Sequence, residues 1–305
     1  MGTFSTPPIT QFIVYTYRLL YSLFQLSRPI SLLLEAFSFN WAAYFSVHQS
    51  FDFLKQKNYW LELLLILLIL ASGYWINDVV DQKIDQINKP HKIIIGNTLS
   101  RKKALTAYFL ATSFILICTI WLLPFRFWIL NFFAVGVLFF YTSHLKKHLA
   151  VANFTVAILS GLTIVAGAVL LHFKIIHLWG IIFIFSLNLL REITKDIEDV
   201  EGDLEHGLHT LPTLVGIRTT QNFLIGGHLY LLALQFIFLI FYYFQYHILP
   251  LFFIAILFFF VILPILNNLY LLIKAQLPHE YHIQRQNLQW ITVTNMVSFL
   301  FLPIV

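Results

Sequence analysis

Residues 60–85 read WLELLLILLILASGYWINDVVDQKID, a long apolar stretch that ends in Asn77, Asp78, Asp81 and Asp85. A transmembrane helix needs about 20 largely apolar residues, so the first part of this stretch predicts a membrane span. Asn77, Asp81 and Asp85 recur every four residues, which places them along one face of a helix. Because Mg²⁺ prefers oxygen ligands and shares them with substrate phosphates, this helix end is a candidate magnesium site.

The rest of the chain is equally apolar. Of its 305 residues, 59% are hydrophobic and only 11% are charged, whereas a soluble domain carries roughly 25% charged residues. We therefore expect an all-α membrane protein that forms a single domain over residues 1–305. Residues 1–28 form an N-terminal segment that lies at the membrane interface. The expected spans are near 29–48, 60–80, 103–123, 125–143, 150–172, 175–194, 222–244, 247–273 and 286–304.

The basic residues predict the orientation of these nine spans. With a cytoplasmic N-terminus, the inner side holds every Lys and Arg except Lys55, Lys57, Arg126 and Lys174, as the positive-inside rule requires. We expect a multi-pass protein of the cytoplasmic membrane of a prokaryote. No basic stretch is interleaved with aromatic residues, so nucleic acid is not an expected partner, and nothing indicates an obligate protein partner.

A second acidic cluster follows the span at 175–194. Residues 191–203 read REITKDIEDVEGD, and Asp196, Asp199 and Asp203 are spaced i, i+3, i+7, which predicts one helical face. Arg191 and Lys195 stand among these acids, and such cations suit the oxygens of a diphosphate. Neither cluster has the loop pattern of an EF-hand, and the scattered histidines do not favour zinc. Two oxygen-rich clusters on one predicted side therefore indicate Mg²⁺ and a diphosphate.

The two clusters resemble the NDxxDxxxD and DxxxD motifs of the UbiA superfamily of intramembrane prenyltransferases. The first motif is matched by residues 77–85 and the second by Asp199 and Asp203. Three shorter segments are similar to further family motifs and follow in the same order: Arg28-Pro29, Tyr141-Thr142-x-x-Leu145-Lys146 with Asn153 after it, and Thr210-Leu211-Pro212-x-x-x-Gly216. The resemblance covers essentially the whole chain.

This resemblance implies nine helices around a central cavity, with both acidic motifs at its cytoplasmic mouth. It implies that Mg²⁺ is bound by Asn77, Asp81, Asp85, Asp196, Asp199 and Asp203. The prenyl diphosphate is then contacted by Lys146, Lys195, Arg28 and Asn153. Asp81, Asp199 and Tyr141 are the expected catalytic residues, while Asp78 and Asp196 are candidates for a general base.

The activity implied is Mg²⁺-dependent transfer of a prenyl group from a prenyl diphosphate to a lipophilic acceptor with an aromatic ring or a hydroxyl group. The stretch from Lys195 to Asp203 is most similar to digeranylgeranylglyceryl phosphate synthases and to chlorophyll and homogentisate prenyltransferases. Lys92, Ile93 and His209 depart from residues frequent in the family. These departures leave the acceptor open.

Two alternatives to a transferase remain. A terpene cyclase of the same fold ionises the same diphosphate without an acceptor. An ion-coupled transporter also carries acidic residues in its spans, but usually at the bilayer midplane beside broken helices. Here the acids gather at span ends, and Glu35 and Glu62 are the exceptions within spans.

Overall fold

The computed structural model describes residues 8–47, 49–88, 90, 93–143, 151–248 and 250–303, apart from the side chains of 8–13 and 142–143. This part of the chain is helical and contains no β-strand. The helices are α1 (Pro8–Leu26), α2 (Pro29–Ser46), η1 (Phe51–Lys55), α3 (Tyr59–Asn88), α4 (Arg101–Leu122), α5 (Phe125–Ser143), α6 (Val151–Val169), α7 (Ile175–Glu198), α8 (Val200–Glu205), α9 (Leu211–Val215), α10 (Ile217–Tyr246), α11 (Leu251–Leu257), η4 (Phe258–Ile262), α12 (Leu263–Lys274), η5 (Pro278–Glu280) and α13 (Tyr281–Phe299). The all-α prediction is confirmed.

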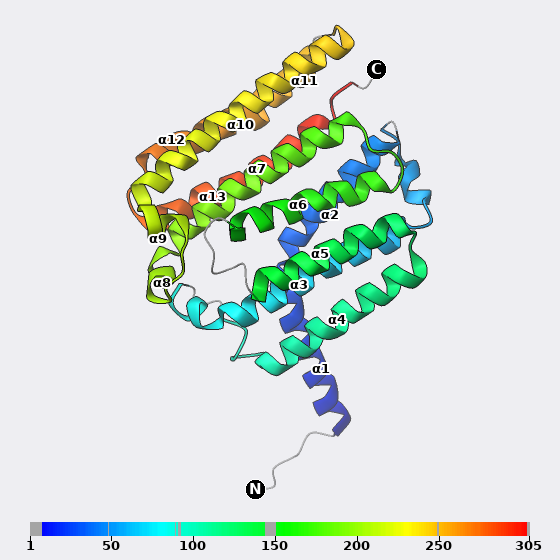
Figure 1. The fold of residues 1–305 in the computed structure, drawn as a ribbon, viewed down its shortest axis with the longest axis vertical. Helices are drawn as coiled ribbons and strands as arrows, with labels where there is room; N and C mark the ends of the chain where they lie inside the picture. The colour runs from blue at the N-terminus through cyan, green and yellow to red at the C-terminus, as the bar shows by residue number, and fades with distance from the viewer. Residues whose placement is uncertain are drawn as a thin grey trace.

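The long helices lie side by side and end at two opposite ends of the molecule (Figure 1). The central pair α2 and α6 packs on α3 and α5 on one side and on α7 and α13 on the other. Each side has its own cluster of buried apolar residues, and both clusters include residues of α2 and α6. The short helices α8 and α9 lie at the end of the bundle where α3 and α7 finish (Figure 1).

Six helices of the described chain are long and apolar enough to cross a membrane: α3, α4, α6, α7, α10 and the continuous helix Leu251–Lys274. The other three predicted spans also coincide with helices, namely α2, α5 and α13. Polar residues such as Gln284, Arg285 and Gln286 lower the hydropathy of α13. The integral, multi-pass character of the protein is therefore clear, whereas the count of nine spans stays a prediction.

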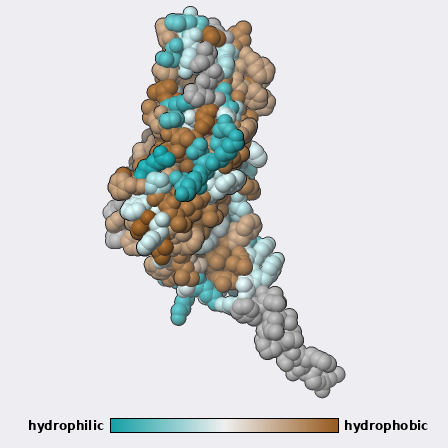
Figure 2. Space-filling model, turned by 90° about the vertical axis from the view of Figure 1, so that its right-hand side faces the viewer, coloured by the Kyte–Doolittle hydropathy of each residue, from teal (hydrophilic) through white to brown (hydrophobic). Residues whose placement is uncertain are grey.

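The surface agrees with a lipid environment. Large hydrophobic side chains are exposed along the outer helices, for example Trp121, Phe244 and Leu251. Figure 2 shows the end of the bundle opposite to α8 and α9, where hydrophilic residues form a narrow band between hydrophobic areas. In water such hydrophobic areas would drive aggregation, whereas lipid tails cover them without cost.

Close contact between α2 and α6 depends on Gly167. A Cβ atom at this position would collide with the carbonyl oxygen of Phe39 and would lie 3.0 Å from the Cβ atom of Ala42. Small residues at such contacts let two helix backbones approach each other inside a membrane. The sequence thus brings the two central helices together at a point where no side chain fits.

We expect Gly167→Ala to lower the free energy of unfolding by about 1–3 kcal/mol, because the added methyl group forces α2 away from α6. Thermal unfolding of the purified protein in detergent measures this effect. Gly136→Ala is the matched control, since a Cβ atom there meets nothing within 4 Å and alanine favours the helix. Equal melting temperatures for the two variants would show that the contact does not matter.

Candidate active site

The two acidic motifs meet at one end of the bundle. The backbone N–H of Gly202 donates a hydrogen bond of 3.0 Å to the side-chain oxygen of Asn88, the last residue of α3. A Cβ atom at Gly202 would overlap the amide group of Asn88, so glycine is required for this approach. Since Asn88 follows Asp85 by one helical turn, the bond ties the end of the first motif to the second.

The second motif is not one continuous helix. Helix α7 ends at Glu198, Asp199 has φ −96° and ψ 8°, and α8 begins at Val200. The expected single helix through Asp196, Asp199 and Asp203 is therefore interrupted, because Asp203 belongs to another helix. The carboxylates of Asp196 and Asp203 still interact electrostatically across the turn. The turn leaves Asp199 and Asp203 buried, at 9% and 6% exposure.

Electrostatics link the two motifs. Burial and the negative charge of Asp199 raise the pKa of Asp203 to about 6, although Lys195 and a hydrogen bond with Thr210 oppose the shift. Asp81 of the first motif contributes to the same increase in the pKa of Asp203. The carboxylates of both motifs therefore repel one another across one site, and a divalent cation would relieve this repulsion.

On the α3 side, hydrogen bonds hold the first motif in place. Asn77 donates a hydrogen bond of 3.0 Å to a carboxylate oxygen of Asp81. Asp78 forms an ion pair of 2.8 Å with Arg28, whose guanidinium lies 4.7 Å from the centre of the Tyr74 ring. Asp78 thus positions Arg28 from the start of α2.

On the α7 side, cations and carboxylates alternate. Glu192 pairs with Arg191 at 3.2 Å and with Lys195 at 3.8 Å. Lys195 is also close enough to Asp199, Tyr141 and Arg28 for electrostatic interaction. The expected diphosphate contacts Arg28 and Lys195 therefore come together from different helices.

Asp196 lies beside α6. Asn153 donates a hydrogen bond of 2.7 Å to the carboxylate of Asp196, so two residues expected to bind metal and diphosphate contact each other. Asp85 is half-buried on α3, one turn beyond Asp81. Lys146 lies outside the described residues.

Glu198 belongs to a different contact. Its carboxylate accepts hydrogen bonds of 2.9 Å from His282 and 2.7 Å from the Nε atom of Arg285. Both partners lie on α13, so Glu198 joins α7 to α13 and takes no part in the site. The sequence pattern alone did not separate Glu198 from its acidic neighbours.

Two site residues were missed as such by the sequence analysis: Tyr74 and Glu192. Glu192 and Tyr74 both interact electrostatically with Arg28. A helical signal was available for Tyr74, because it precedes Asp78 by four residues on α3 and this spacing keeps a helical face. For Glu192 the signal was its place one turn before Asp196.

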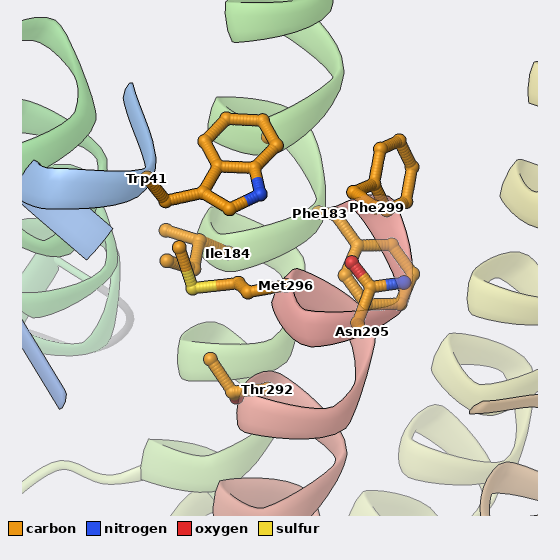
Figure 3. A pocket seen from close by; sticks show the side chains of 8 residues that line it. Trp41, Phe183, Ile184, Thr292, Asn295, Met296 and Phe299 are labelled. Atoms are coloured by element: carbon orange, nitrogen blue, oxygen red, sulfur yellow. The ribbon is translucent and has the colours of Figure 1, made fainter. Parts of the chain in front are cut away.

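A small pocket lies elsewhere, between α2, α7 and α13 (Figure 3). It has room for about one water molecule. The side chains of Trp41 and Asn295 line it, and their buried donors Nε1 and Nδ2 have no acceptor among the described residues. The space is too small for a lipid substrate.

The sequence model of the UbiA prenyltransferase family matches residues 36–281 of this chain. The chain belongs to this family. The match includes both acidic motifs and every helix from most of α2 to the start of α13.

Curated UbiA relatives match about half of the chain. The digeranylgeranylglyceryl phosphate synthase of Sulfolobus acidocaldarius is 35% identical over 171 residues, which are 53% of this chain and 59% of that protein. The protein of the same name from Pyrococcus horikoshii is 38% identical over 164 residues, which are 51% of this chain and 57% of that protein. The chain thus spans less than two thirds of the length of these relatives.

Solved UbiA structures share the fold. One, described as giving structural and mechanistic insights into digeranylgeranylglyceryl phosphate synthase in membranes, has a TM-score of 0.64 at 22% identity and covers 92% of this chain and 97% of that one. A UbiA homolog from Archaeoglobus fulgidus bound to GPP and Mg²⁺ has a TM-score of 0.57 at 17% identity, and covers 70% of this chain and 76% of that one. These similarities show that the helices are arranged as in UbiA proteins.

The donor set fits magnesium. Carboxylates from α3 and from the α7–α8 turn would supply hard oxygen ligands. A cation would also offset the burial and the charge of Asp199 that raise the pKa of Asp203. Within the described ranges, no three Asp, Glu, His or Cys side chains lie close enough to hold a metal ion by themselves. Magnesium usually takes only one or two carboxylates and completes its shell with water and phosphate oxygens. Water and phosphate oxygens would therefore have to complete the shell of a magnesium ion held here.

Proposed function

We propose that this UbiA-family chain transfers a prenyl group from a prenyl diphosphate to a lipophilic acceptor, with Mg²⁺ as cofactor. The observation that carries the proposal is the meeting of the two motifs: Gly202 bonds to Asn88, and Asp81 and Asp199 both act on Asp203. The curated relatives named digeranylgeranylglyceryl phosphate synthase and the fold neighbour bound to GPP and Mg²⁺ support it.

The metal ligands proposed are Asn77, Asp81 and Asp85 from α3 and Asp196, Asp199 and Asp203 from the second motif. When bound, Mg²⁺ neutralises negative charge on the diphosphate oxygens. Asn77 supports this arrangement by orienting the carboxylate of Asp81 through its hydrogen bond. Asp196 is held by Asn153 and so is fixed at the edge of the site.

Cationic side chains then bind the departing diphosphate. Lys195 and Arg28 approach the site from α7 and from the start of α2, and their charges act on each other. Two cations on neighbouring helices favour an anionic ligand, although Glu192 offsets part of their charge. They bind most strongly where negative charge grows as the C–O bond breaks. Lys146, expected to bind the same group, stays a proposal from the sequence.

The prenyl chain would extend between apolar helices, which exclude water from the carbocation that forms at its first carbon. Tyr141 lies near Lys195, and an aromatic ring beside the reacting carbon stabilises positive charge. The acids of the two motifs lie at helix ends on one side of the bundle, which favours this transferase over the ion-coupled transporter. A terpene cyclase differs only in having no acceptor.

The proposed membrane arrangement is nine spans around a central cavity in a single domain, with the N-terminus and the active site on the cytoplasmic side of a cytoplasmic membrane. The excess of Lys and Arg in the loops on that side supports the orientation. The bilayer and the two substrates are the proposed partners.

The proposal is tested by incubating the purified protein with Mg²⁺, a panel of prenyl diphosphates and either a glyceryl phosphate ether lipid or an aromatic acceptor. Mass analysis of the lipid products should show an acceptor that has gained one prenyl group. Prenyl products formed without any acceptor would indicate the cyclase instead. No conversion of any prenyl diphosphate, by a folded protein, would refute the proposal.

A further inference from the structure

Glu35 is an acidic residue inside the bundle that the proposed metal and diphosphate contacts leave without a role. It lies on the central helix α2, seven residues beyond Arg28, which is about 10 Å along the helix axis. A carboxylate at this depth is costly in a membrane and usually marks a functional site. Glu35 therefore needs a group that stabilises its charge, and its position indicates a functional role.

The partners of Glu35 form a second polar layer beneath the first. Thr163 of α6 donates a hydrogen bond of 2.9 Å to its carboxylate. Arg191 of α7 and Tyr74 of α3 are both close enough for electrostatic interaction with it. Arg191 lies one turn deeper than Lys195, and Tyr74 lies one turn deeper than Asp78, so both helices supply a residue to each layer.

The side chains of this layer are not fully enclosed. Glu35, Tyr74 and Arg191 are each half-buried, although they belong to helices that pack against one another. Ion pairs link this layer to the outer one, because Arg191 pairs with Glu192, which also pairs with Lys195. A substrate group that sits beneath the diphosphate would therefore meet the carboxylate of Glu35.

We propose that Glu35 is a catalytic residue that binds the acceptor through a hydroxyl group and takes its proton; this rests on the prenyl transfer proposed above. The bond between the first prenyl carbon and the diphosphate oxygen breaks, and its electron pair leaves with the diphosphate. A lone pair of the acceptor hydroxyl forms the new C–O bond. The hydroxyl proton passes to Glu35, which later releases it to water.

The charge of Glu35 also selects the acceptor. A carboxylate accepts a hydrogen bond from an alcohol, and it repels the carboxylate that an acidic aromatic acceptor would bring to the same place. In the free enzyme, the positive charge of the neighbouring Arg191 offsets part of the negative charge of Glu35. The acceptor class is thus an alcohol carried by a lipid, rather than an aromatic acid.

The test compares Glu35→Gln with a matched control, Glu62→Gln. Glu62 is a fully buried acid that bonds to Asn131 at the opposite end of α3, about 28 Å along the helix from Asp81. Each variant is given a prenyl diphosphate, Mg²⁺ and a glyceryl phosphate ether lipid with one free hydroxyl group. Binding of an unreactive prenyl thiolodiphosphate with Mg²⁺ is measured by calorimetry on the same samples.

We expect Glu35→Gln to lower kcat about 100-fold or more, as loss of a general base does, with prenyl thiolodiphosphate binding within about twofold of wild type. Glu35→Asp should recover part of the rate, and Glu62→Gln should react like wild type. A wild-type rate for Glu35→Gln, or an equal loss of thiolodiphosphate binding, would overturn this role. Wild-type protein that transfers nothing to any acceptor would instead refute the proposed function itself, and this role with it.

Discussion

Replacement of Asp81 by Asn, or of Asp199 by Asn, is expected to lower prenyl transfer at least 1,000-fold. Each change removes one negative charge from one of the two acidic motifs and keeps the size of the side chain. Asp81 belongs to the motif on α3, and Asp199 belongs to the motif at the α7–α8 turn. The proposed magnesium site takes carboxylate ligands from both acidic motifs, which meet where Gly202 bonds to Asn88. Loss of either carboxylate therefore weakens the binding of Mg²⁺, which stabilises the charge of the leaving diphosphate. Such electrostatic stabilisation is usually a dominant contribution to the rate.

The measurement is the rate of product formation at saturating Mg²⁺, followed by mass analysis. Asp52→Asn is the control, because Asp52 is an exposed acid that pairs with Lys55 outside the site. All three variants should elute as folded protein in size-exclusion chromatography. If either motif variant retained more than a tenth of the wild-type rate, its carboxylate would not be a metal ligand.

Lys195→Met is expected to lower kcat by about 100-fold to 1,000-fold. Lys195 stands between Glu192 and Asp199 and lies near Arg28, so its charge faces the proposed diphosphate position. Methionine keeps the length of the side chain and removes only the ammonium group. The transition state for C–O cleavage carries more charge on the diphosphate than the bound substrate does, so the rate should fall more than substrate affinity.

Steady-state kinetics separate these two effects for Lys195→Met, and Lys195→Arg should retain part of the activity. Lys274→Met is the control, because Lys274 is exposed and lies over the ring of Tyr270, on α12. A variant that changes KM alone would place Lys195 in substrate binding and not in stabilisation of the leaving group.

Much of the fold followed from the sequence because membrane helices obey local rules. Each apolar stretch of about 20 residues coincides with a helix, since backbone groups in lipid must bond within their own segment. The stripe of Asn77 and Asp81 was also predictable, because both residues lie within the regular helix α3. The relation of Asp81 to the second motif came from resemblance, and the structure supports it through Asp203.

What the sequence did not predict depends on tertiary contacts. The turn at Asp199 could not be read from spacing, because the same acids would also fit one unbroken helix. It follows from the approach of Gly202 to Asn88, two residues far apart in the chain. Likewise, Glu198 resembles its acidic neighbours in sequence, but its carboxylate pairs with His282 and Arg285 on α13. Partners of this kind appear only once distant helices are placed together.

The central claim is that α3 and the α7–α8 turn bind one magnesium–diphosphate group together. Calorimetric titration of an unreactive prenyl thiolodiphosphate, with and without Mg²⁺, tests it in wild type, Asp81→Asn and Asp199→Asn. We predict Mg²⁺-dependent binding in wild type and its loss in both variants alike, although the altered residues lie on different helices. Mg²⁺-dependent binding of wild-type strength in either variant would contradict the claim.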